Sequence, residues 1–227
     1  MSSAGSLPSE QPPVLGSELP LAVRAQLLAT EHWSLLATRG LTWSEVMSRI
    51  TVHLTVASAS LVVLALVTQA SGFGTAFTVL SIGLTSAVLV LGTLTAIRVH
   101  NASVDDAAMI VGMNRLRAAY LAMDPTIADH LVTSWHDDQA GIVGTYTMGS
   151  RRHIVSHVIG STSMFMTMVN AIVAGTLGAL VADAAGAGPV GTAVIGTLAG
   201  VGYLGGMLEV GRRSFGGPHT EVRFPSA

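Results

Sequence analysis

The feature that most constrains this chain is a long apolar stretch, residues 50–97, in which His53 is the only side chain able to carry a charge. A helix needs about 20 mostly apolar residues to cross a membrane, because the hydrocarbon layer is about 30 Å thick and each helical residue rises about 1.5 Å. The stretch is long enough for two such helices, and residues 71–74, Ser-Gly-Phe-Gly, interrupt it at its middle. It therefore predicts a hairpin of two membrane-spanning helices.

A second apolar stretch, residues 154–208, has the same form. Its middle, residues 184–188, is an uncharged loop, and Pro189 suits the first position of the helix that follows. Half of all residues are apolar and only 11% are charged, which is too apolar for an ordinary soluble domain. We therefore predict an all-α, polytopic membrane protein with four transmembrane helices in two hairpins and a small cytoplasmic helical layer.

The sequence divides into six segments. They are a disordered Ser-, Pro- and Gly-rich tail (1–17), amphipathic helices leading into the first span (18–49), the first hairpin (50–98), a cytoplasmic helical connection (99–153), the second hairpin (154–208) and a cytoplasmic tail (209–227). In the second segment we expect one helix to end at Gly40. Thr42 and Glu45 have the spacing of a capping box, which predicts the start of the next helix.

The connection is expected to hold further short helices. Ser103 suits the start of one, with Asp105 and Asp106 in its first turn, where carboxylates interact well with the helix dipole. Asp124 and Pro125 should end it and begin another that runs to about residue 138, with a loop at 141–149. An apolar seam at alternating spacings of four and three predicts burial against another helix: Met109, Met113, Leu116, Tyr120 and Met123.

The arginines predict how the chain is oriented. All 11 basic residues are arginine, and none lies in the turn of either hairpin. Because basic residues concentrate on the cytoplasmic side, both termini and the connection should be cytoplasmic. An even number of spans independently puts both termini on one side. The absence of lysine, with abundant Ala, Gly and Val, is typical of a high-GC bacterial genome, so we expect the inner membrane of a bacterium.

Several classes of function find no support in the sequence. There is no cysteine, which excludes disulfides and thiolate chemistry, and no motif of a hydrolase, zinc protease, phosphate-binding loop or EF-hand occurs. The net charge of −2 does not favour a nucleic-acid partner. We therefore expect neither an enzyme nor a cofactor. The expected partners are the lipid bilayer, further copies of the chain as a homo-oligomer, and a cytoplasmic protein.

Stripes of small or hydroxyl residues follow the predicted spans. In the third span the stripe includes Ser156, Ser163, Thr167 and Asn170, and in the second span it includes Ser81, Gly92 and Thr95. The favoured interpretation is helix packing, because small residues let helix backbones approach in lipid; the alternative is a narrow hydrated path for an ion. In the fourth span, overlapping GxxxG pairs predict close helix packing: Gly196, Gly200, Gly202 and Gly206.

The histidines near the spans are candidates for an ion or proton site. His53 and His157 lie at similar distances beyond Arg49 and Arg152, so they should sit at similar depth. His153 is one turn before His157. Histidine near neutral pH can bind a proton, and two histidines one turn apart can share a metal, so the identity of any metal stays open. The alternative is a structural role at the membrane boundary.

The predicted function is a choice between two classes. The first is an oligomeric channel or carrier for a small ion. The second is a non-catalytic membrane scaffold or regulatory subunit that docks a partner through its cytoplasmic helices. In layout alone, the order of helix, hairpin and cytoplasmic helix resembles bacterial two-span pore proteins of defence systems, and the second hairpin departs from that layout.

Overall fold

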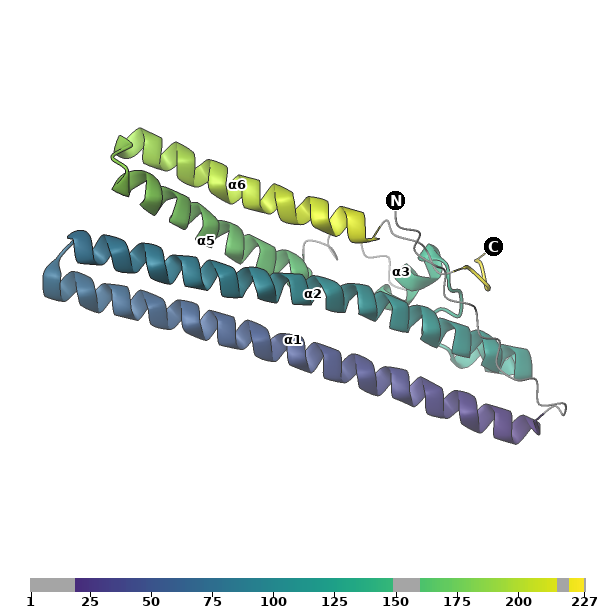
Figure 1. The fold of residues 1–227 in the computed structure, drawn as a ribbon. Helices are drawn as coiled ribbons and strands as arrows, with labels where there is room; N and C mark the ends of the chain where they lie inside the picture. The colour runs from purple at the N-terminus through teal and green to yellow at the C-terminus, as the bar shows by residue number, and fades with distance from the viewer. Residues whose placement is uncertain (1–18, 149–159, 216–220, 227) are drawn as a thin grey trace, which may run out of the picture.

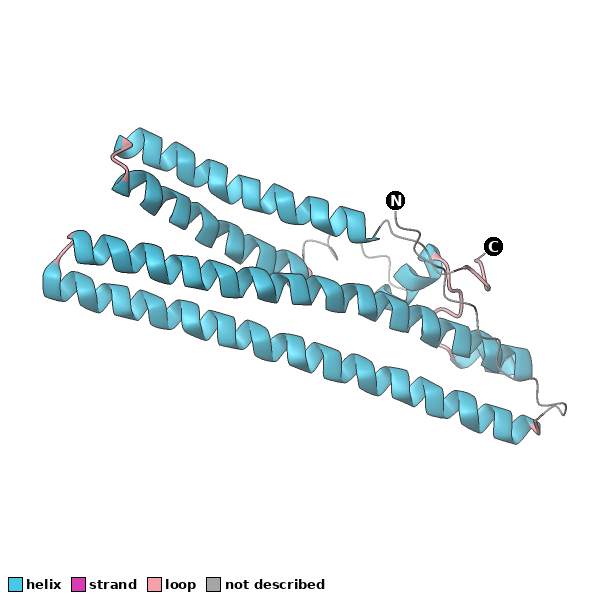
Figure 2. Cartoon of the chain, in the orientation of Figure 1, coloured by secondary structure: helices cyan, strands magenta, loops and turns pink. Residues whose placement is uncertain are grey.

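A computed structural model describes residues 19–148, 160–215 and 221–226. The described part is helical and contains no strand (Figure 2). Its elements are α1 (Leu21–Ser71), α2 (Thr75–Met123), the 3₁₀-helix η1 (Pro125–His130), α3 (Gln139–Thr147), α5 (Thr162–Ala184) and α6 (Gly188–Phe215). Four of these helices are long and apolar, which confirms the predicted fold class.

The long helices form two hairpins. Helix α1 packs against α2, α5 packs against α6, and α2 also packs against α5, so α2 joins the two hairpins. Both hairpin turns lie at the same end of the molecule (Figure 1). The turns depend on glycine, since Gly72, Gly186 and Gly188 have φ values of 68°, 79° and 67°, which other residues rarely adopt. We call the opposite end of the molecule the polar end.

The four long helices make the chain a multi-pass membrane protein. Each is long and apolar enough to cross a bilayer. Each also leaves large apolar side chains exposed: Leu61 on α1, Val79 on α2, Ile172 on α5 and Leu198 on α6 are between 66% and 69% exposed. Lipid tails cover such side chains, because the hydrocarbon layer is as apolar as leucine itself.

Two predicted helix breaks are absent. Helix α1 continues through Gly40, and Thr42 does not cap a new helix; Glu45 instead accepts hydrogen bonds from Arg49 and Arg98. Helix α2 continues through Ser103, whose hydroxyl donates to Val99 O one turn earlier. The two helices pack along one another beyond the membrane, and this packing stabilises helix where the local capping signals alone predicted a break.

The connection after α2 also differs from the prediction. Asp124 caps the next element as expected, accepting from Thr126 N at 2.9 Å, but that element is a 3₁₀-helix that ends at His130. The predicted loop at 141–149 is largely helix α3 instead. Asp138 caps it by accepting from Gly141 N at 2.7 Å. An aspartate is a common helix cap, but the glycines that follow it favoured a loop in the sequence analysis.

The predicted seam of α2 packs against α1. Met113 is buried, and the other seam residues are partly buried. The Tyr120 ring stacks on the His32 ring of α1 with centroids 6.1 Å apart. Beyond the membrane, α1 and α2 therefore form a two-helix stalk, to which η1, α3 and residues 221–226 add at the polar end (Figure 1).

Candidate functional site

Three membrane-spanning helices bring His53 of α1, Gly92 of α2 and Asn170 of α5 to one point. His53 is 1% exposed and Asn170 is 0% exposed. A Cβ atom built on Gly92 would lie 2.7 Å from Cε1 of His53 and nearer still to Oδ1 of Asn170. Both polar side chains therefore adjoin the same glycine, whose lack of a side chain leaves them room. We call these three residues the buried polar cluster.

The polar atoms of this cluster have no hydrogen-bond partners among the described residues. These atoms are Nδ1 and Nε2 of His53 and Nδ2 and Oδ1 of Asn170. A buried donor or acceptor without a partner costs about 1–3 kcal/mol, and an apolar side chain at either position would avoid this. Polar and ionisable groups held inside a membrane despite such a cost mark binding sites and ion or proton pathways.

The orientation of the His53 ring decides which of its atoms faces Asn170. A half-turn of the ring exchanges Cε1 with Nε2 at almost the same shape, and hydrogen bonding alone distinguishes the two orientations. In the orientation described, Cε1 adjoins the space beside the Asn170 amide. After a half-turn, Nε2 would occupy that place. The cluster can thus alternate between a direct imidazole–amide contact and a ring whose nitrogens are open to another ligand.

The hydroxyl groups nearby behave differently. Three buried hydroxyls of the predicted stripes donate to a carbonyl oxygen of their own helix at 2.8–3.0 Å: Ser81 to Thr78, Thr95 to Leu91, and Thr167 to Ser163. These side chains are satisfied without any ligand and let the helices approach closely. The geometry therefore supports the packing interpretation for the hydroxyls and separates them from His53 and Asn170.

The cluster lies near the polar end of the apolar layer. His53 is roughly 5 Å along α1 from Ile50, at about 1.5 Å per residue. Just beyond Ile50, Arg49 Nε and Arg98 Nη2 donate to the Glu45 carboxylate at 2.8 and 2.7 Å. This ion-paired group, on both α1 and α2, marks where the hairpin leaves the membrane. A ligand arriving from the polar end would cross little of the apolar layer to reach the cluster.

The structure brings together two of the predicted site residues, His53 and Asn170, on different helices. Thr167 shares the buried face of α5 with Asn170, and Ser163 is partly buried one turn earlier. Three other candidates lie outside the described residues: His153, Ser156 and His157. The pairing of the two span histidines stays a prediction. Within the described ranges, no three His, Asp or Glu side chains gather as metal ligands would.

The four glycines of α6 that were predicted to pack divide into two pairs. A Cβ atom on Gly196 would lie 2.9 Å from Gly175 O, and one on Gly200 would lie 2.9 Å from Ala171 O, so these two glycines let α6 touch the α5 backbone. Gly202 and Gly206 would meet nothing within 4 Å. Within the described part of this chain the pair faces away from α5, so the close packing predicted for these two glycines stays a prediction.

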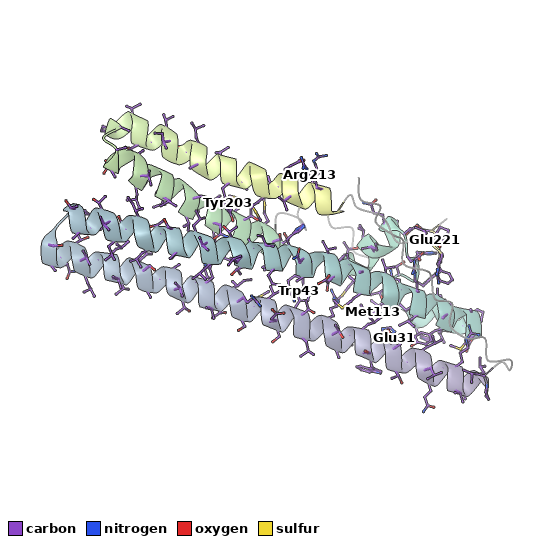
Figure 3. All side chains as sticks on the ribbon, viewed as in Figure 1. Glu31, Trp43, Met113, Tyr203, Arg213 and Glu221 are labelled. Carbon is purple, nitrogen blue, oxygen red and sulfur yellow. The ribbon has the colours of Figure 1, made fainter. Side chains whose placement is uncertain are left out.

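The stalk holds a buried carboxylate that the sequence analysis missed. Asp106 is 1% exposed and accepts from Arg39 Nε at 2.5 Å, Trp43 Nε1 at 2.9 Å and Tyr146 Oη at 2.7 Å; Figure 3 places Trp43 on the side of α1 that faces α2. Burial by itself raises the pKa of Asp106, but these donors outweigh it and hold the pKa below its usual value. Asp106 therefore joins α1, α2 and α3, rather than stabilising the first turn of a helix.

The C-terminal segment is held by a second buried carboxylate. Asp137 accepts from Arg115 Nε at 2.7 Å and from the backbone amides of Arg223 and Phe224 at 2.7–3.1 Å. Asp138 accepts from the amide and hydroxyl of Ser226. Asp137 is only 4% exposed, so it does not lie on a solvated face. A lone Asp-Asp pair gives no sign in the sequence that a distant segment will fold onto it.

Helix α6 contacts α2 near the polar end of the spans. The hydroxyls of Tyr203 and Thr93 lie 3.1 Å apart, and Figure 3 shows Tyr203 on the side of α6 that faces the other helices. This contact satisfies the Tyr203 hydroxyl inside the membrane, so it is a packing feature rather than a second site.

No family model, curated protein or solved structure matches this chain. The assignment of function therefore depends on the geometry of the buried polar cluster and on the chemistry of its residues.

Proposed function

We propose that this multi-pass membrane protein moves a small ion, as a channel or carrier, and that the ion binds at the buried polar cluster. One observation carries the proposal: His53 and Asn170 are fully buried at one point among apolar helices, and none of their polar atoms has a partner in the described part of the chain. An ion or a proton would supply the missing interactions.

The cluster supplies one binding step and not a complete pathway. Toward the hairpin turns, the buried Ser81 hydroxyl already donates to Thr78 O within its own helix. An ion leaving toward the turns would therefore need the helices to move, or a second copy of the chain to complete the route. We propose a homo-oligomer for this reason, with the arginine-rich polar end in the cytoplasm of a bacterium.

Flux measurements on the purified protein in liposomes test the proposal. Vesicles loaded with ion-sensitive dyes should report flux of H⁺, Na⁺ or K⁺, and Asn170→Leu should reduce it at least tenfold. Gly92→Ala should act in the same direction, because its Cβ would displace the His53 ring and the Asn170 amide. The matched control is Gly83→Ala, where a Cβ atom would meet nothing within 4 Å.

The alternative function is a membrane scaffold or regulatory subunit. It is favoured by the satisfied hydroxyls of the stripes and by the extended stalk, in which Asp106 and Asp137 bind several elements together. Absence of flux for all three ions, with correctly folded protein in the vesicles, would reject ion movement and favour this alternative. Flux unchanged in both Asn170→Leu and Gly92→Ala would instead reject the cluster as the ion site.

A further inference from the structure

Resting on the proposed ion movement, we infer that the ion is a proton, which binds to the imidazole of His53 with the Asn170 amide as its hydrogen-bond partner. The inference deepens the proposed function by naming the chemical species. The choice of a proton rests on the ligands that the cluster offers, on the absence of charged residues from the described spans, and on the hydrogen bonds that His53 and Asn170 can form.

The described spans contain almost no ionisable groups. Residues 50–70, 75–97, 162–182 and 189–208 hold no Asp, Glu, Lys or Arg, and His53 is the one histidine among them. A metal cation held in the membrane needs fixed negative charge or a shell of several oxygen ligands. The cluster offers a single amide oxygen and two ring nitrogens. A proton needs only one ring nitrogen, so it is the cation that these ligands suit.

The Asn170 amide can serve both protonation states of His53. A neutral imidazole has one N–H donor and one acceptor nitrogen, whereas the protonated ring has two donors. The amide has an oxygen that accepts and an NH₂ that donates, so it can face either form of the ring by rotating. Both groups lie against Gly92, where a Cβ atom would collide with them. An apolar neighbour would favour the neutral ring alone.

The proton transfer itself is simple. Hydronium donates a proton to a ring nitrogen of His53, an N–H bond forms, and one water molecule leaves; release of the proton to water on the other side reverses these steps. No oxidant or other reactant is required. The imidazolium carries its positive charge only between binding and release.

The charges around the cluster favour a transient imidazolium. On α1 the nearest charged residues are Arg49 and Glu45, which pair with each other. On α2 they are Arg98, which also pairs with Glu45, and the titratable His100. Helix α5 has no ionisable residue before Asp183 at its far end. On α6 the Tyr203 phenol, whose hydroxyl lies 3.1 Å from that of Thr93, is the one titratable group before Glu209. No carboxylate of the described spans adjoins His53 to hold a proton permanently, so a bound proton can leave again.

The decisive experiment combines flux with direct titration of the ring. In protein with ¹⁵N-labelled histidine in lipid nanodiscs, the ring signal that disappears in His53→Gln identifies His53 among the eight histidines, and this signal should titrate between about pH 5 and 8. In liposomes, His53→Gln should lower H⁺ flux at least tenfold, with no Na⁺ or K⁺ flux in the parent protein. His130→Gln is the matched control, because His130 is exposed on η1.

The outcomes separate this inference from the proposed function. If Na⁺ or K⁺ moves and His53→Gln leaves that flux unchanged, the proton inference is wrong while ion movement stands. If the ring titrates but no ion moves, His53 binds a proton without transport, and the proposed function fails. A His53 ring that stays neutral across this pH range, together with H⁺ flux unchanged in His53→Gln, overturns proton binding at this residue.

Discussion

At the scale of single residues, two buried side chains that lack a partner at every polar atom, among the residues the structure describes, lie at the same point. His53 and Asn170 lie in helices that are otherwise apolar or internally satisfied, as the Thr167 hydroxyl is. Burying them without partners lowers stability, and a position that only had to pack would accept leucine. Stability and function should therefore respond in opposite directions to substitutions here.

The double variant His53→Leu with Asn170→Leu tests this opposition. Removing both polar groups together eliminates the unpartnered atoms, so the melting temperature in detergent should be unchanged or higher, while ion flux should fall at least tenfold. Thermal unfolding and liposome flux measure the two effects. A large loss of stability would mean that the groups are partnered in the folded protein, and the pair would then be a structural feature.

At the scale of elements, close helix contact depends on where each glycine faces. In α6, Gly196 and Gly200 touch the α5 backbone, whereas Gly202 and Gly206 face away from it. The same GxxxG spacing thus has two outcomes in one helix. The sequence around the two glycine pairs is similar, and the pairs differ only in which face of α6 they occupy.

A matched pair of alanine variants tests this difference. Gly200→Ala should destabilise the α5–α6 hairpin by about 1–3 kcal/mol, because its Cβ would lie 2.9 Å from a backbone oxygen and the helices would have to separate. Gly206→Ala should be neutral or stabilising by up to about 1 kcal/mol, through helix propensity alone. Thermal melting of both variants gives the comparison, and equal effects would contradict the packing described.

The stalk provides a second element-scale prediction, through Asp106. Its pKa in the folded protein is below the usual value of about 3.9, so its contribution to stability is complete above about pH 4 and is lost as the pH falls through the depressed pKa. Asp106→Asn should lower stability at pH 7 by about 2 kcal/mol, a figure reduced from that of a fully buried pair because Arg39 is one-third exposed.

Measuring the free energy of unfolding at decreasing pH separates the contribution of the Asp106 charge from a loss of packing caused by the substitution. The stability difference between the parent protein and Asp106→Asn should shrink as the pH falls below 4. Asp105→Asn is the matched control, since Asp105 is exposed and makes only a 3.7 Å contact with Arg98. A difference that stays constant down to pH 2 would mean that Asp106 contributes through shape and not through charge.

At the scale of the whole molecule, the two hairpin turns lie at one end, and every described arginine lies in sequence beyond the opposite ends of the apolar spans. This arrangement agrees with the positive-inside rule applied to each hairpin separately. It also brings α3 and residues 221–226 together beside the stalk, at the end where the proposed ion site is nearest to water.

Cysteine labelling in whole cells tests the proposed orientation, and the chain has no native cysteine to interfere. Phe73→Cys and Ala187→Cys, in the two turns, should react with an impermeant thiol reagent, whereas Val132→Cys should react only after lysis. These positions avoid the positive-φ glycines, where cysteine would be strained, and Phe73 and Val132 are 82% and 74% exposed. Labelling at Val132 in intact cells would reverse the orientation.

The sequence by itself determined the parts of this protein that depend on local composition. Whether a segment enters lipid is decided by its own apolar content and length, so residues 50–97 specify a hairpin without knowledge of the rest of the chain. The turns are local for the same reason, because glycine at positions such as Gly72 permits a positive φ. The asparagine and histidine of the cluster were also visible, as polar residues out of place in apolar helices.

Only the tertiary structure decided which residues meet. The approach of His53 and Asn170 to one point requires α1 and α5 to face the same glycine of α2, and helices distant in sequence carry no local sign of that register. The same holds for Asp106, whose partners come from α1 and α3, and for the uninterrupted stalk, where packing between α1 and α2 overrode local capping signals. Such features arise from the mutual orientation of whole helices, which is a property of the packed molecule.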